Sequence, residues 1–212
     1  MKIFGKMLII LAGSVILGAM LLFFTFSLPN GAIRKNAENA GYVFAIESGY
    51  PYMDGKISKG LDNHTDAMMI LNAFFEEEGA TDMQRAMGIW RPSYNEHGCD
   101  IQLQLYLAGE EGYTGISYAR YWHGYLIFLK PLMMMVDYLS FRDINRIIQG
   151  SLILAISILL WKKLSILYVI PFLSTIFFMR PDAVSFSMFY SSVYYVALFS
   201  TIGIILFHAR LS

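Results

Sequence analysis

Residues 118–150 read YARYWHGYLIFLKPLMMMVDYLSFRDINRIIQG, and in this segment the chain passes from polar into nearly unbroken apolar sequence. In a helix that begins at Tyr118, large apolar and aromatic residues share one face (Tyr118, Tyr121, Tyr125, Phe128, Leu132). Tyrosine and tryptophan prefer the headgroup level of a bilayer. Residues 118–139 are therefore predicted to form an amphipathic helix on the membrane surface. Its charged side chains would face water (Arg120, His123, Lys130, Asp137). The alternative is an ordinary buried amphipathic helix.

Two features are expected to interrupt this helix. Pro131 should kink or break it, because proline lacks the N–H and clashes with the preceding turn. The sequence from Ser140 to Asp143 has the spacing of a capping box, which predicts that a new helix starts there and runs into the bilayer.

The composition indicates a membrane protein. Apolar residues make up 56% of the 212 and the mean hydropathy is +0.49, well above the apolar share of soluble domains. The net charge is zero, so no global basic surface would bind nucleic acid. Residues 36–111 nevertheless contain thirteen Asp and Glu against four Lys and Arg, a net charge of −9. The single cysteine, Cys99, excludes an internal disulfide.

Four apolar runs have the length or composition of membrane spans. The first, residues 7–28, follows Lys2 and Lys6 and would make roughly 33 Å of helix. It is predicted to be an uncleaved signal anchor with a cytoplasmic N-terminus. The others cover 147–161, in a helix beginning near Phe141, then 164–179 with Pro171 inside, and 185–207. Four spans place Lys162, Lys163 and Arg210 on the cytoplasmic side, as the positive-inside rule requires.

The sequence therefore predicts a mostly α, polytopic helical membrane protein with four transmembrane helices and an extracytoplasmic α-rich loop domain. It would be a multi-pass protein of the cell membrane with both termini cytoplasmic. The predicted parts are a signal anchor (1–29), an acidic extracytoplasmic domain (30–117), an interfacial helix (118–139) and a three-helix transmembrane region (140–212). Within the acidic domain, helices are expected from Asn63 and after a capping box at Thr81 and Gln84.

Few residues carry a pattern for chemistry, and the chain contains no phosphate-binding glycine loop, zincin or nucleophile-elbow motif. Asp62, His64 and Asp66 place two carboxylates and an imidazole at a helix start, where they could hold a divalent cation or act as a general base. The simpler interpretation is that Asn63 and Asp66 only cap the helix. Residues 96–100 contain metal-ligand residue types without zinc spacing. Arg120 and His123 could grip a phosphate, or only contact lipid headgroups.

The layout resembles the N-terminal part of C-type membrane glycosyltransferases: a signal-anchor helix, a large exported first loop with Asp residues, juxtamembrane helices and closely spaced spans. That resemblance implies a lipid-phosphate-linked sugar as substrate, with Asp66 or Asp62 as base or metal ligand. Such enzymes normally have many more spans, so this chain would be a truncated or minimal relative. The run RYWHGYLIFLKPL also resembles one in uncharacterised membrane proteins of Gram-positive bacteria.

Two functions from different classes are thus expected. The first is a glycosyltransferase-like enzyme that uses a lipid-linked sugar on the outer face of a bacterial membrane, with membrane lipid around it and a divalent cation as a candidate cofactor. The alternative is a non-enzymatic membrane protein whose acidic exported domain binds a partner protein or a cation.

Overall fold

The computed structural model describes residues 2–120 and 123–211. Among them 73% of the chain is helical, in ten α-helices, which confirms a mostly α protein. Three helices are long and apolar enough to cross a membrane: α1 (Lys2–Phe26), α7 (Tyr138–Lys163) and α10 (Met188–Leu211). A fourth apolar helix, α8 (Ile166–Phe178), is shorter and contains Pro171. The predicted apolar runs thus all form helices.

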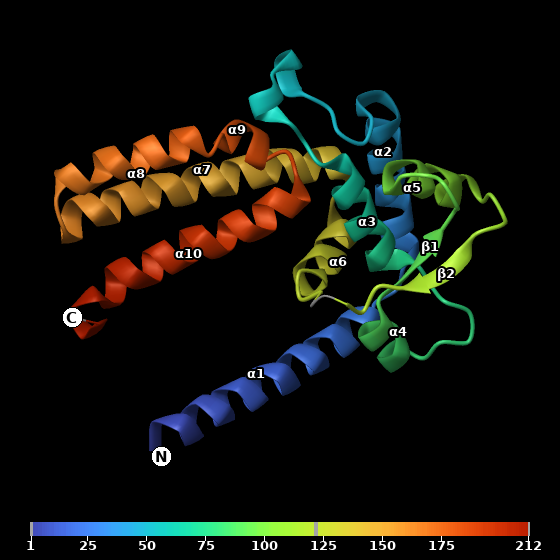
Figure 1. Cartoon of the computed structure of the whole chain (residues 1–212), viewed down its shortest axis with the longest axis horizontal. Coiled ribbons are helices and arrows are strands. Elements are labelled where there is room, and N and C mark those ends of the chain that lie inside the picture. The colour runs from blue at the N-terminus through green and yellow to red at the C-terminus, as the bar shows by residue number, and fades with distance from the viewer. Residues whose placement is uncertain (1, 121–122, 212) are drawn as a thin grey trace.

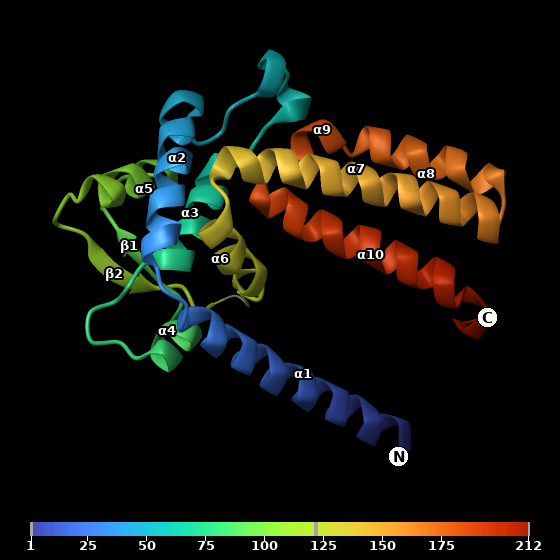
Figure 2. The same cartoon turned by 180° about the vertical axis from the view of Figure 1, so that it is seen from behind.

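The long helices extend from one side of a globular domain. Helices α7, α8 and α10 lie side by side as a bundle, and their shared core contains Ile156, Leu160, Ile176 and Leu198. The start of α1, the end of α10 and the turn after Lys163 all lie at the far end from the domain (Figures 1 and 2). Helix α1 stands apart from the bundle, and only 6% of its most apolar window is buried.

Four helices and a two-stranded antiparallel sheet make up most of the domain. Its helices are α2 (Gly31–Glu47), α3 (Asn63–Phe74), α4 (Asp82–Gly88) and α5 (Cys99–Ala108). Strands β1 (Trp90–Ser93) and β2 (Thr114–Ser117) pair antiparallel, with Trp90 opposite Ser117. Helix α2 forms because Ile33, Ala37, Ala40 and Phe44 recur on one helical face, which is buried against the other helices. The capping box at Thr81 and Gln84 is confirmed.

The segment before the bundle differs from its prediction. Ser117 belongs to β2 and the Tyr118 N–H bonds the Ile89 carbonyl at 2.9 Å, so the chain is still extended there. The helix α6 covers only Leu126–Met135, and Pro131 lies inside it without ending it. Tyr121 lies outside the described residues.

Two polar side chains expected to face water are buried instead. Lys130 is fully buried, because α6 packs on α1, α2 and α3. His123, which precedes α6, is 4% exposed. Helix α7 then begins at Tyr138, not at Ser140. Its N-cap is Asp137, whose side chain accepts a hydrogen bond from the Ser140 N–H at 2.7 Å.

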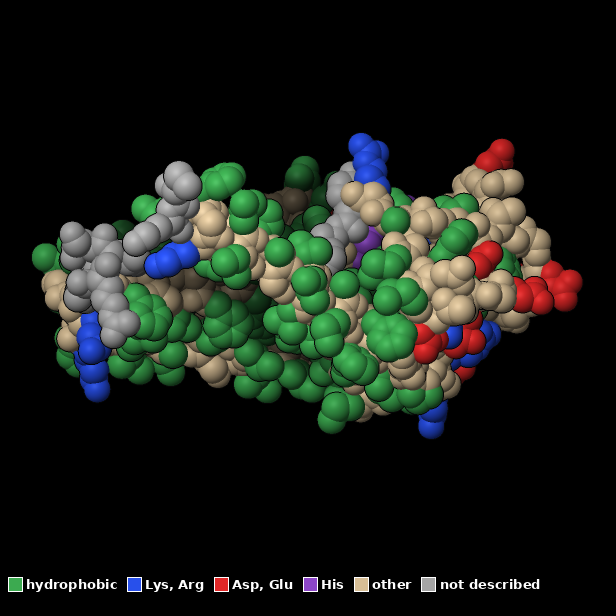
Figure 3. All heavy atoms as spheres, turned by 90° about the horizontal axis from the view of Figure 1, so that it is seen from below, with side chains coloured by type: hydrophobic (Ala, Val, Ile, Leu, Met, Phe, Trp, Pro, Cys, Tyr) green, Lys and Arg blue, Asp and Glu red, His purple; other side chains and the backbone are tan. Residues whose placement is uncertain are grey.

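Three short helical segments complete the fold: η1 (Met53–Gly55), η2 (Ile57–Lys59) and α9 (Pro181–Val184). Helix α9 connects α8 to α10 at the domain end of the bundle (Figure 1). Apolar side chains cover much of the helices, whereas acidic side chains gather at the opposite end, over the domain (Figure 3). This separation of apolar and charged surface is what a bilayer on one side and water on the other would select.

Candidate functional site

Asp66 lies where the domain meets the bundle, and it is completely buried. Its Oδ1 accepts hydrogen bonds from the Ser187 hydroxyl and the Phe189 N–H, both at 2.9 Å. Its Oδ2 accepts from the Tyr138 hydroxyl at 2.7 Å and the Met188 N–H at 2.8 Å. Burial raises the pKa of Asp66 to about 6, against the lowering effect of these four donors. The carboxylate therefore caps the start of α10 from a helix 122 residues earlier.

A second buried charge joins the same cluster. The guanidinium of Arg142, 2% exposed, forms a bidentate pair with Glu47, with distances of 2.6 and 2.8 Å. It also donates to the Phe186 carbonyl at 3.0 Å and the Tyr138 hydroxyl at 3.2 Å. Asn63 donates to Glu47 at 3.0 Å. Although burial raises the pKa of Glu47, the hydrogen bonds from Arg142 and Asn63 hold it below its usual value.

These contacts form one network, which we call the junction network (Glu47, Asn63, Asp66, Tyr138, Arg142, Ser187). It ties α2 and α3 of the domain to α7 and α10 of the bundle. Every charged group in it has an opposite charge or several donors, as a buried charge requires.

The polar contacts continue into the bundle. Asn145 donates to the Ser185 carbonyl at 2.7 Å and to the Ser191 hydroxyl at 2.5 Å. Gln149 donates to the Ser191 hydroxyl at 2.9 Å, and the Tyr195 hydroxyl donates to the Asn145 Oδ1 at 2.6 Å. Sequence reasoning missed these residues. Their signal was the spacing of Arg142, Asn145 and Gln149, which places three polar side chains on one face of an apolar helix.

Asp62 and His64 lie near Asp66 in sequence but make different contacts. Asp62, not Asn63, is the N-cap of α3, and it accepts from the Thr65 N–H and hydroxyl, both at 2.8 Å. The His64 ring stacks on Tyr50 at 5.7 Å, and its Nδ1 accepts from the Cys99 N–H at 3.2 Å. Among the described residues no three His, Cys, Asp or Glu side chains are grouped as a metal site would require. The structure therefore does not bring Asp62, His64 and Asp66 together around one point.

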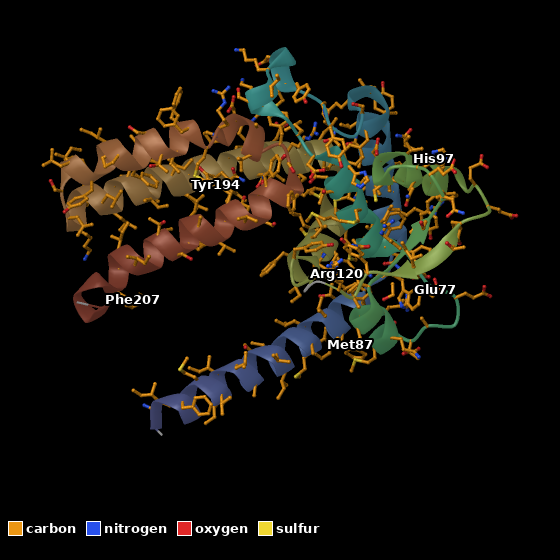
Figure 4. All side chains as sticks on the ribbon, in the orientation of Figure 1. Glu77, Met87, His97, Arg120, Tyr194 and Phe207 are labelled. Carbon is orange, nitrogen blue, oxygen red and sulfur yellow. The ribbon has the colours of Figure 1, made fainter. Side chains whose placement is uncertain are left out.

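The two residues predicted to contact phosphate or headgroups also separate. Arg120 is exposed and lies on the side of the domain from which the long helices extend (Figure 4). His123 is buried, with Nε2 at 2.7 Å from the Tyr118 carbonyl and Nδ1 at 3.2 Å from the Tyr125 hydroxyl. Burial lowers the pKa of His123 below its usual value. Both ring nitrogens of His123 are thus occupied within the protein.

An open hollow of about 500 Å³ lies on the domain surface beside strand β1. Its lining includes Glu77, Glu78, Gln84, Met87 and Trp90. Figure 4 shows Glu77 over the strands and Met87 on α4, close to the end of α1. The sequence shows that residues 36–111 are acidic, but it does not predict Trp90 beside Glu77 and Glu78, because the pairing of β1 with β2 was not predicted.

Comparisons of the chain with protein-family models, with curated proteins and with solved structures found no match. Inferences about function therefore rest on the geometry of these sites.

Proposed function

We propose that this chain is an integral membrane protein with four membrane-crossing helices, α1, α7, α8 and α10. In this proposal both ends are cytoplasmic and the domain is exported. The exported domain binds a cationic group of a partner, and it carries no catalytic base at Asp66.

The direction of the helices supports this topology. The start of α1, the α7–α8 turn and the end of α10 share one end of the molecule (Figure 1). Lys6 lies at that end, and Lys162 and Lys163 form the last turn of α7 there. Basic residues are retained on the cytoplasmic side. Helix α8, with 13 residues, would be roughly 20 Å long, so the bilayer must thin locally or flanking residues must extend the span.

The occupation of Asp66 carries the choice of binding over catalysis. A carboxylate offers about four lone-pair sites, and in Asp66 two donors contact each oxygen. A general base needs a lone pair within reach of a substrate proton, and a metal ligand needs one facing the ion. With these four donors in place, Asp66 has no lone pair left for a substrate proton or a metal ion, and it is fully buried.

The hollow beside β1 has residues suited to binding a cationic group. Trp90, Glu77 and Glu78 line the same open space. An ammonium or guanidinium group is attracted both by an aromatic face and by carboxylates. The net charge of −9 over residues 36–111 would add long-range attraction for a cationic partner.

A titration with tetralysine, followed by calorimetry on the purified chain in detergent, tests this site. The double variant Glu77→Gln, Glu78→Gln should weaken binding about tenfold, since each exposed charge contact contributes roughly 0.2–1 kcal/mol. The matched control is Glu110→Gln, Glu111→Gln, which removes an adjacent acidic pair that does not line the hollow. Equal weakening by both pairs, or no binding by the parent chain, would contradict the proposal.

A glycosyltransferase-like activity remains a second candidate, favoured by the layout of one helix before the domain and three after it. In that case Asp62 is better placed than Asp66 to act as base, because among the described residues its carboxylate bonds only Thr65, which fills part of its lone-pair capacity. Sugar transfer from a polyprenyl-phosphate-linked donor that is lost in Asp62→Asn and kept in Asp62→Glu would support it.

A further inference from the structure

A compact loop projects from the domain next to the bundle. We call residues 50–60 the tyrosine loop; it contains η1 and η2 between α2 and α3. A bridge between Tyr52 and Gly60 and a 2.9 Å hydrogen bond from the Leu61 N–H to the Pro51 carbonyl close its base. Asp54 and Gly55 turn the tip with φ angles of 54° and 65°. The loop therefore has a defined shape.

Salt bridges fix this loop against the bundle. The Lys59 amine lies 2.7 Å from Asp182 of α9 and 2.8 Å from Asp54 of the loop itself. In Figures 1 and 2 the cyan loop projects beside α9, clear of the domain core. Helix α9 is the turn between α8 and α10 at the domain end of the bundle. In the topology proposed above, that turn lies at the outer headgroup level, and Lys59 holds the loop at the same level.

The exposed side chains of the loop are those that favour a membrane interface. Ile57 is 83% exposed, Tyr50 61% and Tyr52 55%. Exposing an isoleucine side chain to water is unfavourable. A tyrosine at the headgroup level, by contrast, keeps its ring in apolar surroundings and its hydroxyl in polar ones. Lys56 and Lys59 are two of only four basic residues in the acidic span 36–111. With Asp54 counted, the loop has a net charge of +1 and Lys56 is its lysine outside the Lys59 salt bridges. The loop is thus apolar and weakly basic within an acidic domain, which suits the phosphates and upper acyl chains of lipid.

We propose that the tyrosine loop inserts into the outer leaflet, with Ile57 at the acyl boundary, Tyr50 and Tyr52 among the headgroups and Lys56 near lipid phosphate. This inference rests on the proposed topology. The loop would give the domain a contact with lipid on the α9 side of the bundle, in addition to the anchor that α1 provides. The partner of this surface is therefore the lipid bilayer.

Single-cysteine fluorescence tests the insertion. Ile57→Cys is labelled with the fluorophore NBD, and the chain is reconstituted into phosphatidylcholine vesicles. Ile101→Cys on α5, 42% exposed, is the matched control on the domain. The native Cys99 is 3% exposed and burial raises the pKa of its thiol, so the parent chain should label little. Doxyl-labelled lipid should quench the probe at position 57 several-fold more than the probe at 101, and iodide should do the reverse.

Two outcomes would overturn the insertion. Quenching by iodide that is equal at both positions would place Ile57 in water. Protection of position 57 from both quenchers would mean that protein, such as a second copy, covers the loop. A membrane-impermeant thiol reagent applied to intact cells reads the topology separately at position 101. Labelling there combined with a water-exposed Ile57 would refute the insertion alone, whereas no labelling of an accessible 101 would refute the topology.

Discussion

Replacing Asp66 by asparagine should detach the start of α10 from the domain. The sequence alone predicts that Asp66→Asn keeps a helix cap and removes only a charge. In the structure Asp62 caps α3, while Asp66 receives four donors from the α7 and α10 segments. An asparagine has one acceptor oxygen with two lone pairs. Two of the four donors would therefore face an amide that itself donates.

The magnitude follows from those two lost hydrogen bonds. A hydrogen bond to a charged group contributes roughly 1.5–3 kcal/mol, so their loss costs about 3–6 kcal/mol. A neutral amide is less costly to bury than a carboxylate, which offsets part of this loss. We expect a net decrease of about 2–4 kcal/mol in the free energy of unfolding, a large share of the roughly 5–15 kcal/mol of a typical protein.

Hydrogen exchange in detergent micelles measures the effect locally. The Met188 and Phe189 N–H groups donate directly to Asp66, so their protection should fall about 30-fold or more in Asp66→Asn. Asp62→Asn is the matched control, because Asn and Asp are equivalent N-caps and its stability should change by less than about 0.5 kcal/mol. Equal stability of the two variants, with both amides still protected, would refute the role assigned to Asp66.

Two further predictions concern the helices and a buried lysine. Reporter fusions should place Gly79 outside and Lys163 inside the cell, and a cytoplasmic Gly79 would contradict the topology. Lys130 is fully buried, its amine has no hydrogen-bond partner among the described residues, and burial lowers its pKa to about 8. Since the unfolded value is higher, near 10.5, the charged amine destabilises the fold at pH 7. Lys130→Met should therefore be more stable than the parent chain by at most about 3 kcal/mol. The difference should shrink as the pH rises from 8 to 10.5; a difference that does not depend on pH would exclude the titration of Lys130 as its cause.

The sequence predicted the helices that are apolar along their whole length, and from their caps also α3 and α4, but it missed α2 and α5. Long hydrophobic runs identify α1, α7 and α10 without knowledge of any contact. Helix α2 depends on small residues such as Ala37 and Ala40, fully buried against neighbouring elements, and small residues give a weak periodic signal. Strands β1 and β2 pair although residues 94–113 separate them, and no short turn motif predicts such a pairing.

The candidate site was harder to predict because its partners are distant in sequence. Asp66 and its local pattern were identified, yet its function depends on Met188 and Phe189. The pairing of Glu47 with Arg142 spans 95 residues. Arg142 itself was visible as a charge in the predicted capping box, and its alignment with Asn145 and Gln149 was the available sign of a polar face inside the bundle. The start of α7 was misplaced because Asp137 competes with Ser140 as a cap and lies one turn earlier.

The junction network couples helices α7 and α10 to the domain. Buried charge pairs contribute little net stability compared with apolar packing, but removing one partner is strongly destabilising, so such pairs allow one arrangement and penalise others. Here Glu47 and Asp66 on the domain side require Arg142 of α7 and the start of α10 to keep their positions. Helix α1 is joined to the domain differently: most of its described side chains are exposed, and near its end Leu22 and Phe26 are buried in the domain core, where α1 packs on α4 and α6. A partner that binds the domain would therefore act on α7 and α10 through buried charges and hydrogen bonds, and on α1 through apolar packing at its end.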